Sequence, residues 1–288
     1  MITAETSTET DQKLNALVRQ VRDLPALPET VMRVIRLADD PKSGTAAVAK
    51  ALVSDQALAA RVLKLANSAF YGSSRRIATV SDAVVILGMR TTRNLVMAAS
   101  CEALLESEVA GYGLPRGALL RHSLACASAA QALAKRAKYR GLEEAFVAGL
   151  LHDIGKVVMN TYQREQFSEV LTKASGGVTY AEAEQAVFGF DHAEAGACLL
   201  ERWNLPLSLV SAVQYHHAPL NAPGDSPLPC LVHAADAVCI TLGIGLGLDS
   251  PACRLQPKAL SVLGLTPADF EEVARQTCDL LSEAGPLS

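Results

Sequence analysis

The sequence predicts an all-α protein in which an N-terminal helical bundle packs on a second helical part. Apolar residues recur with a period of about 3.6 residues along most of the 288-residue chain, as on the buried face of a helix. Alternating β-branched runs bounded by turn residues, the usual signal of strands, are scarce. Half of the residues are hydrophobic, which is enough to build a core without disulfide or metal staples.

Two helices of the first part have recognisable start signals. Ser54 is a candidate N-cap for a helix whose apolar residues follow at helical spacing, and Ser81 is a candidate N-cap for a helix that ends before Gly88. The apolar positions are Leu58, Val62 and Leu65 in the first helix, and Val84, Val85 and Leu87 in the second. Both patterns predict packed helices of a bundle.

The segment "GYGLPRG" combines glycine and proline and predicts a boundary near residue 113. We therefore expect a disordered N-terminus over residues 1–14, the N-terminal helical part over 15–113, and a second helical part with the C-terminal helices over 114–288. The polar, acidic start lacks a secretory signal, which predicts a cytoplasmic protein. The apolar run Ala237–Leu248 is too short and too rich in glycine to span a membrane.

Composition argues against two further classes of protein. Seven cysteines without a CxxC pair predict neither a disulfide framework nor a thiolate zinc site. A net charge of -4 gives no overall attraction to nucleic acid. Four arginines flank "TVSDAVVILGMRTTRN", but the pattern of a recognition helix is absent, so we expect a solvated face and no nucleic-acid partner. They are Arg75, Arg76, Arg90 and Arg93.

All six histidines lie in the second part of the chain. They are His122, His152, His192, His216, His217 and His233. In "AFVAGLLHDIGKVV", apolar residues recur every four positions and predict one helix, with His152 and Lys156 on a separate polar face. A single buried histidine usually just finds a hydrogen bond, but six in one region favour a site.

The adjacent His152 and Asp153 suit a metal site. A neutral imidazole and a carboxylate can approach one cation together, and the second carboxylate oxygen is free to bridge to another ion. Lys156, one turn later, is placed to hold a phosphate oxygen or an attacking water near such ions. His233 fits equally well as a capping or packing residue and is left out of the candidate site.

The order His, His-Asp, His, His-His, Asp resembles the HD superfamily of metal-dependent phosphohydrolases, including its HD-GYP branch. Over nearly the whole chain the sequence is more similar to the HDOD family (HD-related output domain). The segments that carry this resemblance are "LPALPETVMRVIRLADDP", "VSDQALAARVLKLANSAFYG", "ATVSDAVVILGMRTTRNLV", "EEAFVAGLLHDIGK" and "DHAEAGACLLERWNLPLSLVSAVQYHH".

The resemblance implies an HD-type second part and a retained metal pocket holding one or two divalent ions of iron, manganese or zinc. Carried over by position, the metal ligands are His122, His152, Asp153, His192, His216, His217 and Asp236. Asp153 would bridge the ions, and Lys156 would stabilise charge at the reacting group, which makes these two the candidate catalytic residues. Ala118 stands where a glutamate could have supplied a further ligand, and no GYP continuation follows His217, which argues against a third metal and a cyclic-dinucleotide pocket.

Two functions follow from the resemblance. The first is a regulatory or output module of bacterial signal transduction that binds signalling proteins or a nucleotide second messenger. The second is a metal-dependent phosphohydrolase with a dinuclear His/Asp site. Neither function requires a membrane, and both are compatible with a homodimer. The two differ in that a non-catalytic module tolerates the loss of Lys156, whereas an enzyme does not.

Overall fold

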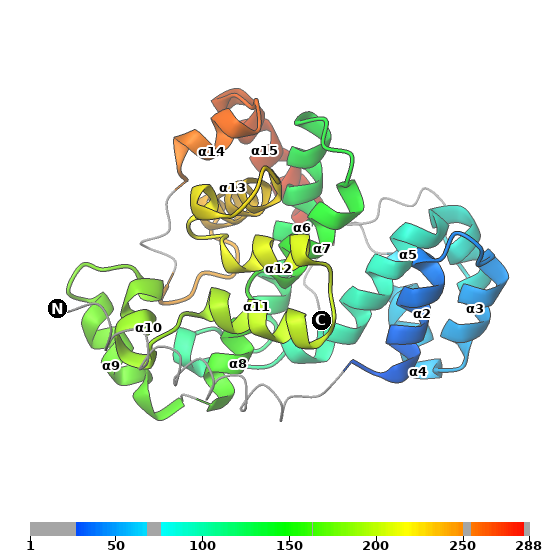
Figure 1. Cartoon of the computed structure of the whole chain (residues 1–288), viewed down its shortest axis with the longest axis horizontal. Helices are drawn as coiled ribbons and strands as arrows, with labels where there is room; N and C mark the ends of the chain where they lie inside the picture. Colours follow the sequence, from blue (N-terminus) through cyan, green and yellow to red (C-terminus); the bar gives the residue numbers. More distant parts are fainter. Residues whose placement is uncertain (1–26, 68–75, 163, 250–254, 285–288) are drawn as a thin grey trace.

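The computed structural model describes residues 27–67, 76–162, 164–249 and 255–284. These residues form helices and no β-strand, apart from one isolated bridge between Val109 and Leu114. The predicted all-α class is confirmed (Figure 1). The segment 1–14, Arg75 and Cys253 lie outside the described residues, and the six described cysteines are free thiols.

Three short helices pack around a long one to form the N-terminal bundle. They are α2 (Glu29–Asp39), α3 (Thr45–Val53) and α4 (Gln56–Ala66), and the long helix is α5 (Val80–Leu105). Their inward faces carry fully buried aliphatic residues such as Val31, Leu52 and Val62. Burial of apolar area, at about 25 cal/mol per Å², is what holds these short helices in place.

Neighbouring residues perform the capping that Ser54 and Ser81 were expected to perform. The Asp55 side chain accepts from the Leu58 backbone N–H at 2.9 Å and caps α4, whereas Ser54 ends α3. Thr79 caps α5, so Ser81 lies inside that helix. Both predictions were wrong by one or two residues because adjacent side chains with equal capping ability compete for the same position.

The helix expected to end before Gly88 continues beyond it. Gly88 adopts φ 82° and ψ 165°, a conformation that favours glycine, and the chain then resumes as a helix up to Leu105. Beyond this kink, Asn94 donates to the backbone oxygen of Glu143 at 2.9 Å and joins α5 to the second part. Arg93 pairs with Asp39 of α2 at 2.6 Å. The kinked helix therefore contacts both parts of the chain.

Ten α-helices of the described residues form the second part. They are α6 (Ala118–Arg136), α7 (Leu142–Leu151), α8 (Ile154–Tyr162), α9 (Phe167–Ala174), α10 (Tyr180–Phe188), α11 (His192–Arg202), α12 (Leu207–Gln214), α13 (Leu228–Thr241), α14 (Pro257–Val262) and α15 (Pro267–Ala284). Helix α6 packs on α7 and α13, and α8 packs on α11, in the middle of the molecule (Figure 1). These three contacts surround the candidate site.

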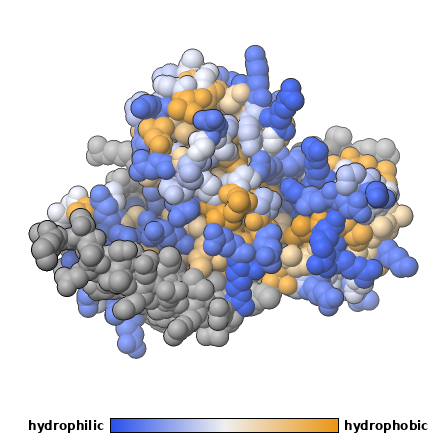
Figure 2. Space-filling model, in the orientation of Figure 1, coloured by the Kyte–Doolittle hydropathy of each residue, from blue (hydrophilic) through white to orange (hydrophobic). Residues whose placement is uncertain are grey.

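The surface gives few further indications of function. On the face seen in Figure 2, hydrophobic residues reach the surface in several places, including the N-terminal bundle, between stretches of hydrophilic residues. Trp203, at the end of α11, is buried in the core. Among the described residues, no helix combines the length and the apolar character needed to cross a bilayer.

Candidate metal centre

The stretch "GLLHDIGK" was predicted to be one continuous helix, and it is two. Helix α7 ends at Leu151 and α8 begins at Ile154, so that His152 and Asp153 form the turn between them. Both side chains are buried, at 0% and 2% exposure. A turn directs adjacent side chains to one centre, which consecutive positions of a straight helix do not.

Two glycines in this stretch bring the neighbouring helices into backbone contact. A Cβ atom on Gly149 would lie 2.8 Å from the Ala127 Cα of α6, and one on Gly155 would lie 1.8 Å from the His192 carbonyl oxygen of α11. Any larger residue would push these helices apart. The glycines thus place His122 of α6 and His192 of α11 beside the His152–Asp153 turn.

The structure brings all seven predicted ligand residues to one centre, in two sets. The first is the carboxylate-rich set, made of His122, His152, Asp153 and Asp236. Asp153 Oδ2 lies 3.6 Å from His122 Nε2 and 3.3 Å from His152 Nε2. Asp236 Oδ1, from α13, lies 3.2 Å from His122 Nε2 and 3.8 Å from His152 Nε2.

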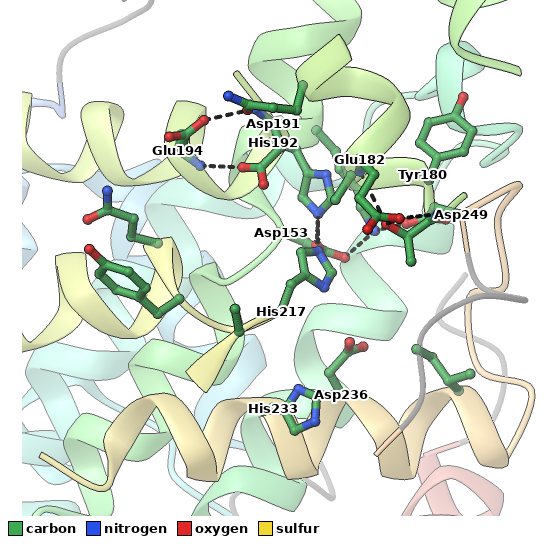
Figure 3. Close-up of a pocket in the computed structure, with 18 of the residues that line it drawn as sticks. Asp153, Tyr180, Glu182, Asp191, His192, Glu194, His217, His233, Asp236 and Asp249 are labelled. Atoms are coloured by element: carbon green, nitrogen blue, oxygen red, sulfur yellow. Dashed lines mark hydrogen bonds and ion pairs between the residues drawn. The ribbon is translucent and has the colours of Figure 1, made fainter. Parts of the chain in front are cut away.

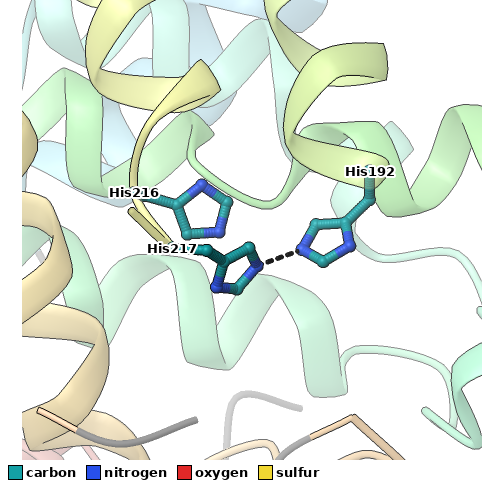
Figure 4. Close-up of side chains that lie close together, drawn as sticks. All are labelled: His192, His216 and His217. Atoms are coloured by element: carbon teal, nitrogen blue, oxygen red, sulfur yellow. Dashed lines mark hydrogen bonds between the residues drawn. The ribbon is translucent and has the colours of Figure 1, made fainter. Parts of the chain in front are cut away.

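The second is the histidine-rich set, made of His192, His216 and His217 (Figure 4). The Nε2 atoms of His192 and His217 lie 2.7 Å apart. Asp153 faces this set with its other oxygen, because Oδ1 lies 3.5 Å from His192 Nε2 and 3.7 Å from His216 Nε2. One carboxylate therefore stands between the two sets with one oxygen directed to each.

Hydrogen bonds fix the tautomers of the candidate ligands. The Nδ1 atoms of His122, His152 and His216 donate to backbone carbonyls at 2.9, 2.8 and 2.7 Å. In its neutral form each ring therefore keeps a lone pair on Nε2, the atom that faces the centre. His216 Nε2 is buried and has no hydrogen-bond partner. A buried acceptor without a partner is costly, and a cation at this position would satisfy it.

Glu184 is a supporting residue that the sequence reasoning missed. It is fully buried and accepts from Nδ1 of His192 at 2.7 Å, from the His192 backbone N–H at 3.0 Å, and from the Tyr112 hydroxyl. Its carboxylate holds the His192 ring with Nε2 toward the centre. The available signal was its place on α10, where it shares the buried stripe of Tyr180 and Phe188 at i-4 and i+4.

Burial and neighbouring charges shift the pKa values of His122 and His216, one from each set, in opposite directions. Burial lowers the pKa of His122, but the carboxylates of Asp236 and Asp153 outweigh it and raise that pKa to about 10. The pKa of His216 falls to about 3 because of burial and the proximity of His152. Burial raises the pKa of Asp153, but nearby His152 and Lys156 outweigh it and hold that pKa well below its usual value.

Lys156 lies between two carboxylates. Its Nζ is 2.6 Å from Asp153 Oδ2 and 2.5 Å from Asp249 Oδ2, and it stands 5.5 Å from the centre of the Tyr112 ring. Burial lowers the pKa of Lys156, but the two carboxylates outweigh it and raise that pKa above its ordinary value. Asp249 was not predicted as a site residue, because it follows a glycine-rich run that carries no ligand pattern.

A cavity of about 610 Å³ opens onto the centre (Figure 3). Six carboxylate residues line it, whereas Lys156 is the only lysine or arginine among its lining residues. The six are Asp153, Glu182, Asp191, Glu194, Asp236 and Asp249. Asp191 caps α11 by accepting from the Glu194 backbone N–H at 2.9 Å, which is a structural role.

His233 also lines the cavity, but both of its ring nitrogens are occupied. Nδ1 donates to the His216 carbonyl at 2.8 Å, and Nε2 accepts from the Gln256 backbone N–H at 3.0 Å. The ring therefore has no lone pair to offer a metal ion, and it supports the position of His216 instead.

Comparison with known proteins places this geometry in a family. The HDOD domain pattern matches residues 24–219, which is more than half of the chain. The chain belongs to the HDOD family. An uncharacterized protein from Treponema pallidum (strain Nichols) is 27% identical over 77% of this chain, and the chain spans only 43% of that relative's length.

Solved HDOD-type structures agree with the fold. An HDOD domain protein of unknown function from Geobacter sulfurreducens is 27% identical, with a TM-score of 0.72 over 94% of this chain and 99% of its own. A proposed phosphohydrolase from Shewanella amazonensis SB2B is 28% identical, with a TM-score of 0.75 over 93% of this chain and 95% of its own. The family resemblance seen in the sequence is confirmed.

Proposed function

We propose that this HDOD protein is a signalling module that binds two divalent metal ions in the pocket and, through them, a phosphate-bearing ligand such as a nucleotide. The observation that supports this most directly is the convergence of histidine Nε2 atoms on Asp153, with His216 Nε2 buried and without a partner. His122, His152, Asp153 and Asp236 would hold one ion. His192, His216 and His217 would hold the other with Asp153.

Charge makes metal a condition of phosphate binding. The cavity is lined by six carboxylates and one lysine, so an anion entering without metal meets repulsion. Divalent ions held by the two sets reverse the local charge and provide Lewis-acid positions for phosphate oxygens. Imidazole and carboxylate ligands together suit iron, manganese or zinc. The affinity for phosphate compounds should therefore rise from undetectable to measurable when the metals are supplied.

Hydrolysis of the bound phosphate ester is the second candidate function, and the position of Asp153 favours it. Its two oxygens face the two sets, the arrangement that places a pair of metal ions side by side. Ions held by the two sets would lower the pKa of a bound water enough for it to act as a nucleophile near neutral pH. Lys156, beside the same carboxylate, is the group placed to stabilise charge on the phosphate.

The test compares wild-type protein, purified without a histidine tag, with Asp153→Ala and Glu182→Gln. Glu182 lines the same cavity but belongs to neither set, so its variant is the matched control. Inductively coupled plasma mass spectrometry should find about two ions per chain in wild type and control and none in Asp153→Ala. Metal-free wild-type protein would refute the proposal. With metal present, turnover of a nucleotide or aryl phosphate separates the hydrolase from the non-catalytic module.

A further inference from the structure

The ammonium group of Lys156 is paired with two carboxylates. Its Nζ lies 2.6 Å from Asp153 Oδ2 and 2.5 Å from Asp249 Oδ2, and it stands 5.5 Å from the centre of the Tyr112 ring. The Lys156 side chain is only 7% exposed, so bulk water hardly competes with these carboxylates for the ammonium group. An anion that binds this ammonium therefore competes with the two carboxylates already paired with it.

The two carboxylates differ in how firmly other groups hold them. Asp153 is 2% exposed and stands between the two ligand sets, where both of its oxygens have nearby imidazole nitrogens. Asp249 comes from the segment that follows α13, its side chain is 12% exposed, and it forms part of the cavity wall (Figure 3). Asp249 is therefore the carboxylate that an incoming anion can displace.

Backbone contacts hold the segment that presents Asp249. The Ile244 carbonyl accepts from Nδ1 of His122 at 2.9 Å, and the Leu248 N–H donates to the Tyr112 carbonyl at 2.8 Å. A Cβ atom on Gly245 would lie 2.7 Å from the His122 Cβ, so the segment lies directly against a candidate ligand. The carboxylate is thus presented by a fixed backbone and not by a freely moving loop end.

We propose that Asp249 occupies the anion position of Lys156 and acts as a specificity-determining residue that a phosphate group must displace. The inference rests on the proposed metal-dependent binding of phosphate in this pocket. A small anion, such as orthophosphate, gains one contact and must break an existing ion pair. A larger phosphate ester can offset that cost through further contacts in the 610 Å³ cavity. Asp249 therefore discriminates against small anions.

The experiment uses the full chain loaded with Mn²⁺ and orthophosphate as the probe. Asp249→Asn should bind orthophosphate about tenfold more tightly than wild type in isothermal titration calorimetry. Glu182→Gln removes a carboxylate from the same cavity without touching Lys156, so its affinity should stay within about twofold of wild type. An equal gain in orthophosphate affinity in both variants would overturn the inference, because it would mean that any carboxylate of the cavity repels the anion to the same extent.

A double-mutant cycle with Lys156→Met isolates the pair. In the Lys156→Met background, Asp249→Asn should give no gain in orthophosphate affinity, and a gain as large as in wild type would overturn the inference. If Lys156→Met does not fold, the comparison with Glu182→Gln decides alone. Metal content is measured on every variant. A wild-type chain without metal refutes the proposed function, whereas full metal content without a gain in Asp249→Asn refutes only the role of Asp249.

Discussion

The two ligand sets share Asp153 but differ in charge. The carboxylate-rich set adds Asp236, and its His122 has a pKa raised to about 10. The histidine-rich set adds no carboxylate ligand, and its His216 has a pKa lowered to about 3 by burial and by His152. Without metal, a proton on His122 therefore takes over part of the positive charge that an ion would supply, whereas His216 stays neutral with an unpaired nitrogen.

This contrast indicates what each set requires. The carboxylate-rich set can balance its charge with protons, so metal uptake there must compete with a proton. The histidine-rich set holds two rings, His216 and His217, whose pKa values are both lowered by burial and by neighbouring imidazoles. These two rings are neutral ligands ready for an ion. Burial lowers the pKa of His192, but Glu184 outweighs it and raises that pKa to about 9, so an ion in this set competes with a proton on His192 alone. The variants below test this difference, beginning with the residue that the sets share.

Asp153→Ala should have the largest effect, because it removes the one carboxylate that faces both sets. We expect metal content to fall from about two ions per chain to none, together with the metal-dependent rise in melting temperature, which corresponds to about 2.7 kcal/mol at a metal concentration one hundred times Kd. Mass spectrometry and thermal melting with and without Mn²⁺ measure both quantities. Retention of one ion would mean that one set binds independently of Asp153.

Asp236→Asn and His217→Gln should each remove a single ion, from different sets. Asp236 Oδ1 lies 3.2 Å from His122 Nε2, whereas His217 Nε2 lies 2.7 Å from His192 Nε2. Each variant should therefore contain about one ion per chain, and the double variant none. Titration with Mn²⁺ followed by electron paramagnetic resonance counts the remaining sites. Loss of both ions in either single variant would show that the sets do not fill separately.

Glu184→Gln should weaken only the histidine-rich set, because Glu184 contacts His192 and none of the carboxylate-rich ligands. The loss of a charged partner behind a metal-binding histidine typically reduces metal affinity by about 10- to 100-fold. Tyr112→Phe, which removes a hydrogen bond to Glu184 but leaves the contact with His192, is the matched control and should change affinity less. Equal weakening of both sets would contradict the assignment.

The pH dependence of the metal-free protein should show the smallest effects, in opposite directions. The folded-state pKa of His122, about 10, exceeds its reference value of 6.5, so its contribution to stability is complete below pH 6.5 and is lost as the pH rises toward 10. The folded-state pKa of His216, about 3, lies below 6.5, so its contribution is complete above pH 6.5 and is lost as the pH falls toward 3.

Chemical unfolding of the metal-free protein at a series of pH values tests the direction in which each histidine changes the unfolding free energy. His122→Gln should reduce the fall of the unfolding free energy between pH 6.5 and 10, and His216→Gln should reduce the fall below pH 6.5. The difference between each variant and wild type isolates the contribution of a single group from the rest of the titration. Parallel changes in both variants over one pH range would contradict the contrast between the sets.

Helical periodicity, a local signal, predicted the helical class, and the resemblance to the HD superfamily pointed to the seven residues that meet at the centre. The sequence did not predict the break of the helix at His152–Asp153, which depends on contacts of α7 and α8 with other helices. Glu184 and Asp249 were missed for a related reason. Each contacts a site residue from a different part of the chain, Glu184 from α10 and Asp249 from the segment after α13, and neither belongs to a motif of its own.

The contact between α8 and α11 has a consequence for how the centre tolerates change. At this contact the Gly155 nitrogen lies 3.2 Å from the position that a Cβ atom on Gly196 would take, so main chain meets main chain without an intervening side chain. A rotamer change cannot absorb a substitution there. The backbone positions from which Asp153 and His192 reach the centre are therefore set by direct main-chain contact between the two helices.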